Sequence, residues 1–159
     1  MTELVALSRR QWLLAASSVA LNAVALAAPV NLPSAAHLDV DLAGALESHR
    51  PLLVMVSLDG CPFCKIVREN YLAPMREREG LAVAQIDMRS KATVVDFLGK
   101  TWTHDALIRS WGVKVAPSVL FFGRDGVEIA DRMVGGYIPD FYGSYLSDRL
   151  SAARIALKL

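Results

Sequence analysis

Cys61 and Cys64 are the only cysteines of the 159-residue chain, and they stand where an apolar run meets a helical pattern. The run covers residues 52–58 and predicts a buried strand, because it is short and rich in Leu, Val and Met. A turn at Asp59-Gly60 follows, and apolar residues then recur at helical spacing from 63 to 71. A buried strand that feeds a helix whose first turn carries Cys-x-x-Cys is the arrangement of a thiol–disulfide redox site.

The residues of the motif suit this chemistry. Pro62 fits the first helical turn, where its missing N–H is not needed. Unpaired backbone N–H groups and the positive end of the helix dipole surround Cys61 and favour its thiolate, the form that attacks disulfides. Cys64 lies one turn further along, where it can resolve a mixed disulfide and form a Cys61–Cys64 bond.

Two other interpretations of the cysteine pair are weaker. A structural disulfide would close a loop of four residues, which removes little chain entropy. A zinc site normally needs four ligands, and no second cysteine pair exists. The three histidines, at positions 37, 49 and 104, are scattered rather than at ligand spacing. We therefore expect no metal and no cofactor.

The first 27 residues predict an export signal. Arg9-Arg10 opens the segment, an Ala-rich apolar stretch follows, and small residues permit cleavage after Ala27. The order Ser-Arg-Arg-x-aromatic-Leu, with Trp12 as the aromatic residue, resembles a twin-arginine signal; an ordinary Sec signal is the alternative. The apolar stretch is shorter than the roughly 20 residues that span a bilayer, so a retained anchor is the minor alternative. The expected compartment is the periplasm.

Residues 28–159 then predict a single domain, and this length is enough for one core. The segment carries equal numbers of basic and acidic side chains. Balanced charge gives no support to nucleic-acid binding, and the sequence shows no cluster of cations that could form a glutathione site. A lone cysteine pair in an oxidising compartment indicates a fold that disulfides do not hold together.

The order of elements predicts an α/β domain with a central mixed β-sheet flanked by helices. We expect a helix that Asp39 or Asp41 caps, and we expect Pro74 to interrupt the cysteine helix. The last helix should present Phe141, Tyr142, Tyr145, Leu146 and Leu150 on its apolar face. The predicted elements are helices over 38–49, 104–111 and 139–157, strands over 52–58 and 81–88, a small hairpin over 93–101, and a second hairpin that pairs 118–122 with 127–133.

In this order of parts the chain resembles the thioredoxin family. The resemblance rests on the strand into Cys61-Pro62-Phe63-Cys64-Lys65 and on later segments, namely Trp111-Gly112-Val113, Ala116-Pro117-Ser118, Phe121-Phe122, the turn from Gly123 to Gly126, Gly135 and the last helix. The extra segment between Asp87 and Trp111 resembles a periplasmic thioredoxin-like branch, associated with bacterial sulfur oxidation, more than it resembles thioredoxin itself.

The resemblance implies a thioredoxin-like fold in which the Ala116–Pro117 bond is cis and lies against the cysteines. It also implies that Pro62, Phe63, Ala116 and Pro117 bind the substrate, with the Ala116 backbone open to an extended segment. The chain departs from the family at Met55, where thioredoxins carry a buried acid, and at Gly60, where they carry a tryptophan.

These observations predict a thiol–disulfide oxidoreductase that exchanges disulfides with protein thiols, most simply as a reductase and as a monomer. A reductase in an oxidising periplasm needs a membrane thiol partner as its electron donor. The competing prediction is a binding module, either a redox-inert adaptor or a copper carrier in which His104 adds a third ligand to Cys61 and Cys64.

Overall fold

The strand before the cysteines is the centre of the sheet. In the computed structural model, which describes residues 31–136 and 139–158, β1 (Leu52–Ser57) is buried along its whole length. It pairs in parallel with β2 (Val83–Asp87) on one side and antiparallel with β5 (Ser118–Phe122) on the other, and β6 (Glu128–Val134) pairs with β5. The strand order β2-β1-β5-β6 makes the expected mixed sheet.

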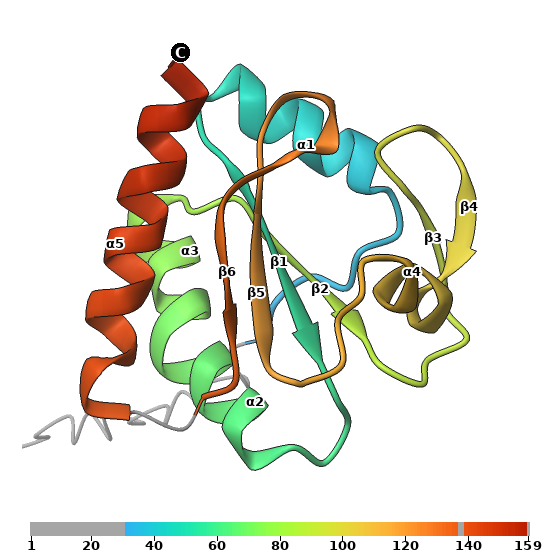
Figure 1. Ribbon diagram of the computed structural model, residues 1–159, viewed down its shortest axis with the longest axis horizontal. Helices are drawn as coiled ribbons and strands as arrows, with labels where there is room; N and C mark the ends of the chain where they lie inside the picture. Colours follow the sequence, from blue (N-terminus) through green and yellow to red (C-terminus); the bar gives the residue numbers. More distant parts are fainter. Residues whose placement is uncertain (1–30, 137–138, 159) are drawn as a thin grey trace, which may run out of the picture.

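Alternate residues of the central strands pack into two cores, because side chains of a strand point to opposite faces in turn. Leu53, Met55 and Phe121 face α5 (Pro139–Lys158) and the cysteine helix. Val54, Val56 and Leu120 face α1 (Leu38–Glu47) and α4 (His104–Ser110). Figure 1 shows α5 and α3 together beside the sheet, with α4 and a small hairpin on the other side of the molecule.

The cysteine helix continues past Pro74, so the predicted interruption is wrong. α2 (Pro62–Val67) runs into a π-helical turn over Arg68–Leu72 and then into α3 (Ala73–Glu79). The Ala73 N–H bonds to the Arg68 carbonyl in this wider turn. Pro74 therefore stands at the start of α3, a position that proline favours, and Gly80 ends the helix in a left-handed conformation.

Two other expectations about the helices need correction. His37, rather than Asp39 or Asp41, is the N-cap of α1 and makes no side-chain capping bond; both acids lie in the first turn, where they favour the helix dipole. On α5, Phe141 and Tyr145 are exposed, because the helix packs on one narrow stripe. The buried positions of α5 are Tyr142, Leu146, Leu150, Ala153 and Leu157.

The two predicted hairpins are confirmed, although the smaller one extends to Thr103 rather than ending at residue 101. β3 (Thr93–Val95) and β4 (Thr101–Thr103) form the small hairpin. The Thr103 hydroxyl accepts from the Ala106 N–H at 3.2 Å and caps α4. The turn between β5 and β6 is a single 3₁₀ turn over Arg124–Gly126, and Gly126 has a positive φ.

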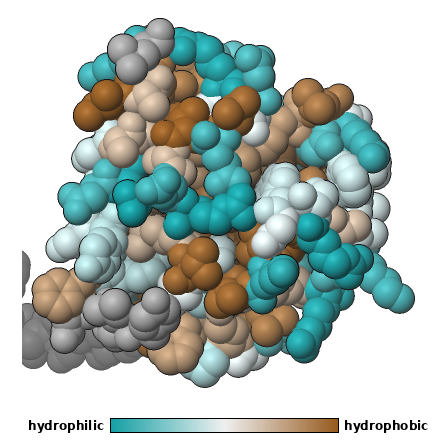
Figure 2. All heavy atoms as spheres, viewed as in Figure 1, coloured by the Kyte–Doolittle hydropathy of each residue, from teal (hydrophilic) through white to brown (hydrophobic). Residues whose placement is uncertain are grey.

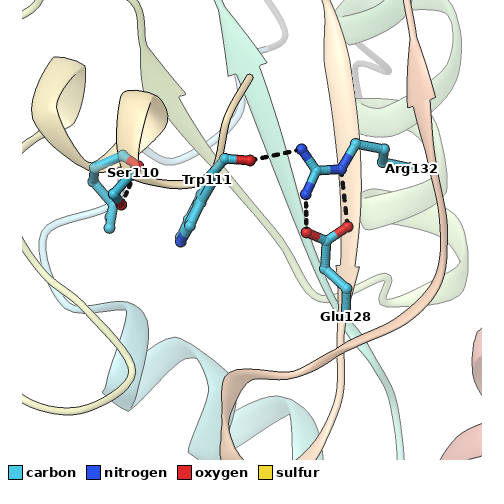
Figure 3. A network of polar contacts seen from close by, with 5 residues as sticks. Ser110, Trp111, Glu128 and Arg132 are labelled. Atoms are coloured by element: carbon cyan, nitrogen blue, oxygen red, sulfur yellow. Dashed lines mark hydrogen bonds and ion pairs between the residues drawn. The ribbon is translucent and has the colours of Figure 1, made fainter. Parts of the chain in front are cut away.

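Arg132 of β6 hydrogen bonds to the segment that leads from α4 into β5. Its Nη1 donates to the Trp111 carbonyl at 2.9 Å, and the same guanidinium pairs with Glu128 (Figure 3). Trp111 also stacks with Phe97 at 6.1 Å between ring centroids. These contacts hold the start of the segment over residues 111–117, at whose end Pro117 lies.

Candidate active site

Cys61 and Cys64 form one turn of helix at the end of β1. Cys61 is the N-cap of α2, and its Sγ accepts a hydrogen bond from the Cys64 backbone N–H at 3.1 Å. Pro62 occupies the first position of the helix, as its ring geometry favours. Both cysteines are free thiols. The sulfur of Cys61 therefore receives a backbone donor from the same turn that carries the second thiol.

The two thiols differ in burial. Cys64 is fully buried, whereas Cys61 is partly exposed at the surface. Burial raises the pKa of Cys64 to about 11, and a hydrogen bond with Cys61 adds to this rise. The Ser57 hydroxyl and the Leu58 backbone oppose the rise in the pKa of Cys64 by hydrogen bonding to it. At neutral pH Cys64 is thus a protonated, buried thiol, whereas Cys61 is the accessible one.

The segment before β5 approaches Cys61 from one side. The Ala116–Pro117 peptide bond is cis, and the Cys61 thiol lies 4.0 Å from the Ala116 carbonyl oxygen. Pro117 is buried and Ala116 half-buried. Within the described residues, Ala116 makes no backbone-to-backbone hydrogen bond, whereas the Pro117 carbonyl accepts from the Gly135 N–H at 2.7 Å. Ala116 thus has no strand partner among the described residues, and its carbonyl oxygen faces the Cys61 thiol.

Side chains around this segment form an apolar surface. Phe63 is 48% exposed, Val115 46% and Val134 50%, which is high for large hydrophobic residues. In Figure 2 hydrophobic side chains gather at the lower end of the face, over the ends of β5 and β6. We call Phe63, Val115, Ala116, Pro117 and Val134 the apolar side of Cys61.

Gly136 is a site residue whose role the sequence did not reveal. A Cβ at this position would meet Pro117 Cγ at 3.3 Å, Phe63 Cβ at 3.4 Å and Val67 Cγ2 at 3.4 Å. The chain after β6 therefore packs directly against the apolar side. Gly135 and Gly136 are adjacent in the sequence, but only the fold shows what Gly136 approaches.

Met55 stands where the family carries a buried acid, and it is fully buried. It belongs to the same core cluster as Cys64, together with Val119 and Tyr142. The groups that hydrogen bond to Cys64 and lower its pKa are instead the Leu58 backbone and Ser57, the one hydroxyl in the apolar run of β1. Proton removal from Cys64 thus has no carboxylate at the position where thioredoxins have one.

His104 is used inside the fold. It is buried, its Nδ1 accepts from the Asp87 N–H at 3.2 Å, and its Nε2 lies 2.9 Å from the Ala35 carbonyl, to which it donates. The ring links β2, α4 and the segment before α1. Among residues 31–136 and 139–158, no group of three or more His, Cys, Asp or Glu side chains is placed to hold a metal ion.

A family model described as a thioredoxin-like domain matches residues 38–148, which is more than half of the chain. The chain belongs to the thioredoxin-like family. No curated protein matches it. The cysteine pair at the start of α2 fits the redox site of a thiol–disulfide oxidoreductase of this family.

Solved structures of the family are similar in fold. A poplar thioredoxin h mutant is 19% identical, covers 77% of this chain and 84% of its own, and superposes with a TM-score of 0.51. The periplasmic thioredoxin SoxS from Paracoccus pantotrophus is 18% identical, covers 65% of this chain and 98% of its own, with a TM-score of 0.41. A DsbH oxidoreductase is 19% identical, covers 81% and 86%, with a TM-score of 0.49.

Proposed function

We propose that this protein is an exported thiol–disulfide oxidoreductase of the reductase type that exchanges disulfides with protein thiols. The observation that carries the proposal is the geometry of the cysteine pair: an accessible Cys61, whose Sγ accepts the Cys64 N–H, above a buried Cys64. In the proposed reaction the Cys61 thiolate attacks a substrate disulfide and forms a mixed disulfide. Cys64 then attacks Cys61 Sγ and releases the reduced substrate.

The apolar side supplies the substrate contact in this proposal. An extended segment of the substrate pairs with the Ala116 backbone, as a strand added to an edge, while Pro62 and Phe63 contact the residues beside its cysteine. The 4.0 Å between the Cys61 thiol and the Ala116 carbonyl supports this arrangement, since it places the attacking sulfur beside the pairing groups.

Copper binding remains the second candidate, because two thiols at this spacing bind soft metals. It requires His104 as a third ligand, and both nitrogens of His104 already have partners in the core. Stoichiometric copper binding that is lost in His104→Ala, without any disulfide exchange, would favour this candidate over the oxidoreductase.

The reduction potential of the Cys61–Cys64 pair tests the proposal. We expect a two-electron couple tens of millivolts above thioredoxin's roughly −270 mV, where about 30 mV corresponds to 1.4 kcal/mol. The reasons are the Pro62-Phe63 pair between the cysteines and Met55, which replaces a buried carboxylate that would oppose a nearby thiolate. Titration against glutathione buffers, followed by thiol alkylation, measures it. A value at or below −270 mV contradicts this argument, and the absence of a couple contradicts the function.

Export is part of the proposal, and the segment that carries it, residues 1–27, lies outside the described residues. No helix within residues 31–136 and 139–158 is long and apolar enough to cross a membrane. A periplasmic reductase would draw its electrons from a membrane thiol partner. The sulfur-oxidation branch stays a prediction of the sequence.

Replacing Arg9 and Arg10 with Lys tests the export route, because it keeps the charge but removes the guanidinium pair that the twin-arginine pathway reads. We expect loss of the protein from the periplasmic fraction. Unimpaired export of this variant would instead indicate the Sec route, and retention of the wild-type protein in the cytoplasm would contradict export itself.

A further inference from the structure

A second surface meets Cys61, on the side away from the proline segment. An open cleft of about 1000 Å³ reaches from Cys61 and Pro62 across the ends of β1 and β2. Its lining includes Ser57, Gln85 and Asp87. Because β2 and β5 flank β1 on opposite sides, this cleft and the apolar side lie on opposite sides of the attacking sulfur.

The cleft collects three cations from two parts of the chain: Lys65 and Arg68 from the cysteine helix, one in α2 and one in the π-helical turn, and Arg89 from the loop after β2. The ion pairs within the described residues all involve other side chains. None of the three cations therefore has a carboxylate within ion-pair distance in this part of the chain. We call this surface the cationic side of Cys61.

The two carboxylates of the cleft do not cancel this charge. Asp87 accepts from Gln85 Nε2 at 2.8 Å, and Gln85 Oε1 in turn accepts from Arg68 Nη1 at 2.9 Å, so an amide separates the acid from the guanidinium. Arg68 Nε is buried and has no acceptor among the described residues. Asp59 lies in the exposed turn at the rim. Three cations against two anions leave the cleft positive.

Arg89 has a left-handed backbone conformation, which is unfavourable for a residue with a side chain. Its φ is +62°, in the left-handed region that glycine adopts more readily than a residue with a Cβ. The Arg89 N–H donates to Asp105 Oδ1 at 2.9 Å, which holds the turn. A glycine would keep the turn at lower cost but would remove the guanidinium from the cleft. Such strain is characteristic of residues kept for a function.

We propose that the cationic side binds carboxylate groups of the disulfide substrate while its sulfur reacts with Cys61. The inference rests on the proposed oxidoreductase function and names the class of substrate: disulfides that carry carboxylates a few bonds from the sulfur. The Debye length is about 8 Å at physiological ionic strength, so the cations of the cleft can attract a carboxylate that lies a few bonds from the reacting sulfur. The carboxylates come either from a small anionic disulfide or from acidic residues beside a protein cysteine.

The chemistry balances without a further reactant. The Cys61 thiolate forms a bond to one substrate sulfur, the substrate S–S bond breaks, and the leaving thiolate takes the electron pair and then a proton from water. Cys64 loses its proton to water and attacks Cys61 Sγ, and the second substrate thiol leaves. Two electrons pass from the cysteine pair to the substrate, and the Cys61–Cys64 disulfide forms.

Three small disulfides of similar size and different charge test the proposal: dithiodipropionate, which is anionic, hydroxyethyl disulfide, which is neutral, and cystamine, which is cationic. The second-order rate of oxidation of the reduced full-length protein is measured for each at low and high salt. Each rate is divided by the rate of the same disulfide with dithiothreitol. We expect the normalised rate of the anion to exceed that of the cation by about tenfold at low salt, and the ratio to shrink at high salt.

Arg89→Ala is the decisive variant, and Arg154→Ala is its matched control. Arg154 is exposed on the C-terminal part of α5, at the opposite end of the molecule from the start of α2 (Figure 1). We expect Arg89→Ala to lower the anion-to-cation ratio severalfold and to leave the rate with the neutral disulfide unchanged, whereas Arg154→Ala keeps the ratio. Equal ratios in the two variants, or a wild-type preference for cystamine, overturn the proposal.

The neutral disulfide separates this inference from the function beneath it. If the protein reacts with hydroxyethyl disulfide but does not prefer the anionic disulfide to the cationic one, only the cationic side is refuted. If it reacts with none of the disulfides, both the cationic side and the oxidoreductase function are refuted. Glutathione disulfide and a peptide disulfide with aspartates beside its cysteine, each compared with a lysine-flanked peptide, then identify the source of the carboxylates. A preference for either one over the lysine-flanked peptide supports the cleft, and no preference contradicts it.

Discussion

The two sides of Cys61 are built in different ways. The apolar side consists of Phe63 on α2, the segment before β5 and the end of β6. Backbone hydrogen bonds hold the last two to the sheet, and Gly136 packs closely against Phe63 and Pro117. The cationic side consists of long side chains that the cysteine helix and the loop after β2 bring to one cleft. Apolar area attracts any hydrophobic segment without direction, whereas fixed charges discriminate between partners. The comparison suggests that one side provides affinity and the other selectivity.

The largest expected effect concerns Cys61, whose sulfur lies between the apolar side and the cationic side. Iodoacetamide at pH 7 should alkylate Cys61 at least 100-fold faster than Cys64 in the reduced protein. Cys64 is fully buried, and with a pKa of about 11 only about one molecule in 10,000 carries its thiolate at this pH. Peptide mapping after short labelling times measures both rates. If Cys64 were labelled as fast as Cys61, neither side would face the attacking thiol.

The pH dependence provides a control for this assignment. In Cys61→Ser, burial remains as the main cause of the raised pKa of Cys64. Its alkylation should therefore stay slow at neutral pH and keep rising above pH 9, as the thiolate forms only at high pH. Cys64→Ala should leave the labelling of Cys61 fast. A plateau of Cys64 labelling near neutral pH would show that the buried thiol is not protonated there.

A smaller effect should separate the two sides by substrate. Phe63→Ser removes an aromatic side chain that is 48% exposed beside Cys61. Loss of a contact worth about 1.5 kcal/mol lowers kcat/KM by about tenfold for a peptide disulfide with apolar flanks. The same variant should react normally with dithiodipropionate, whose carboxylates meet the other side. An equal loss for both substrates would show that the two sides do not act independently.

The strand and the helix of the active site could be predicted because their patterns are local. The run into Cys61 has strand length, the residues after it have helical spacing, and Pro62 suits a helix start. The thioredoxin-like fold followed from the order of such elements. Where the sequence failed, a tertiary effect decided: Pro74 is accommodated by a π-helical turn, and Phe141 lies outside the narrow stripe by which α5 packs.

The cationic side is the part of the site that the sequence did not predict. Lys65 and Arg68 are one turn apart, but Arg89 follows 21 positions later, and nothing in its own neighbourhood connects it with the cysteines. The parallel register of β1 and β2, which places Ser57 opposite Asp87, brings the loop of Arg89 to the end of the cysteine strand. Long-range register is not visible in composition or periodicity.

The central claim is that Cys61 attacks disulfides and Cys64 resolves the product. Incubation of Cys64→Ser with a disulfide-containing protein, followed by non-reducing mass spectrometry, tests it most directly. We predict a stable mixed disulfide through Cys61 in Cys64→Ser, no such adduct in Cys61→Ser, and only a transient adduct in the wild type. No trapped adduct in Cys64→Ser, or an adduct through Cys64 in Cys61→Ser that forms as readily, would contradict the account.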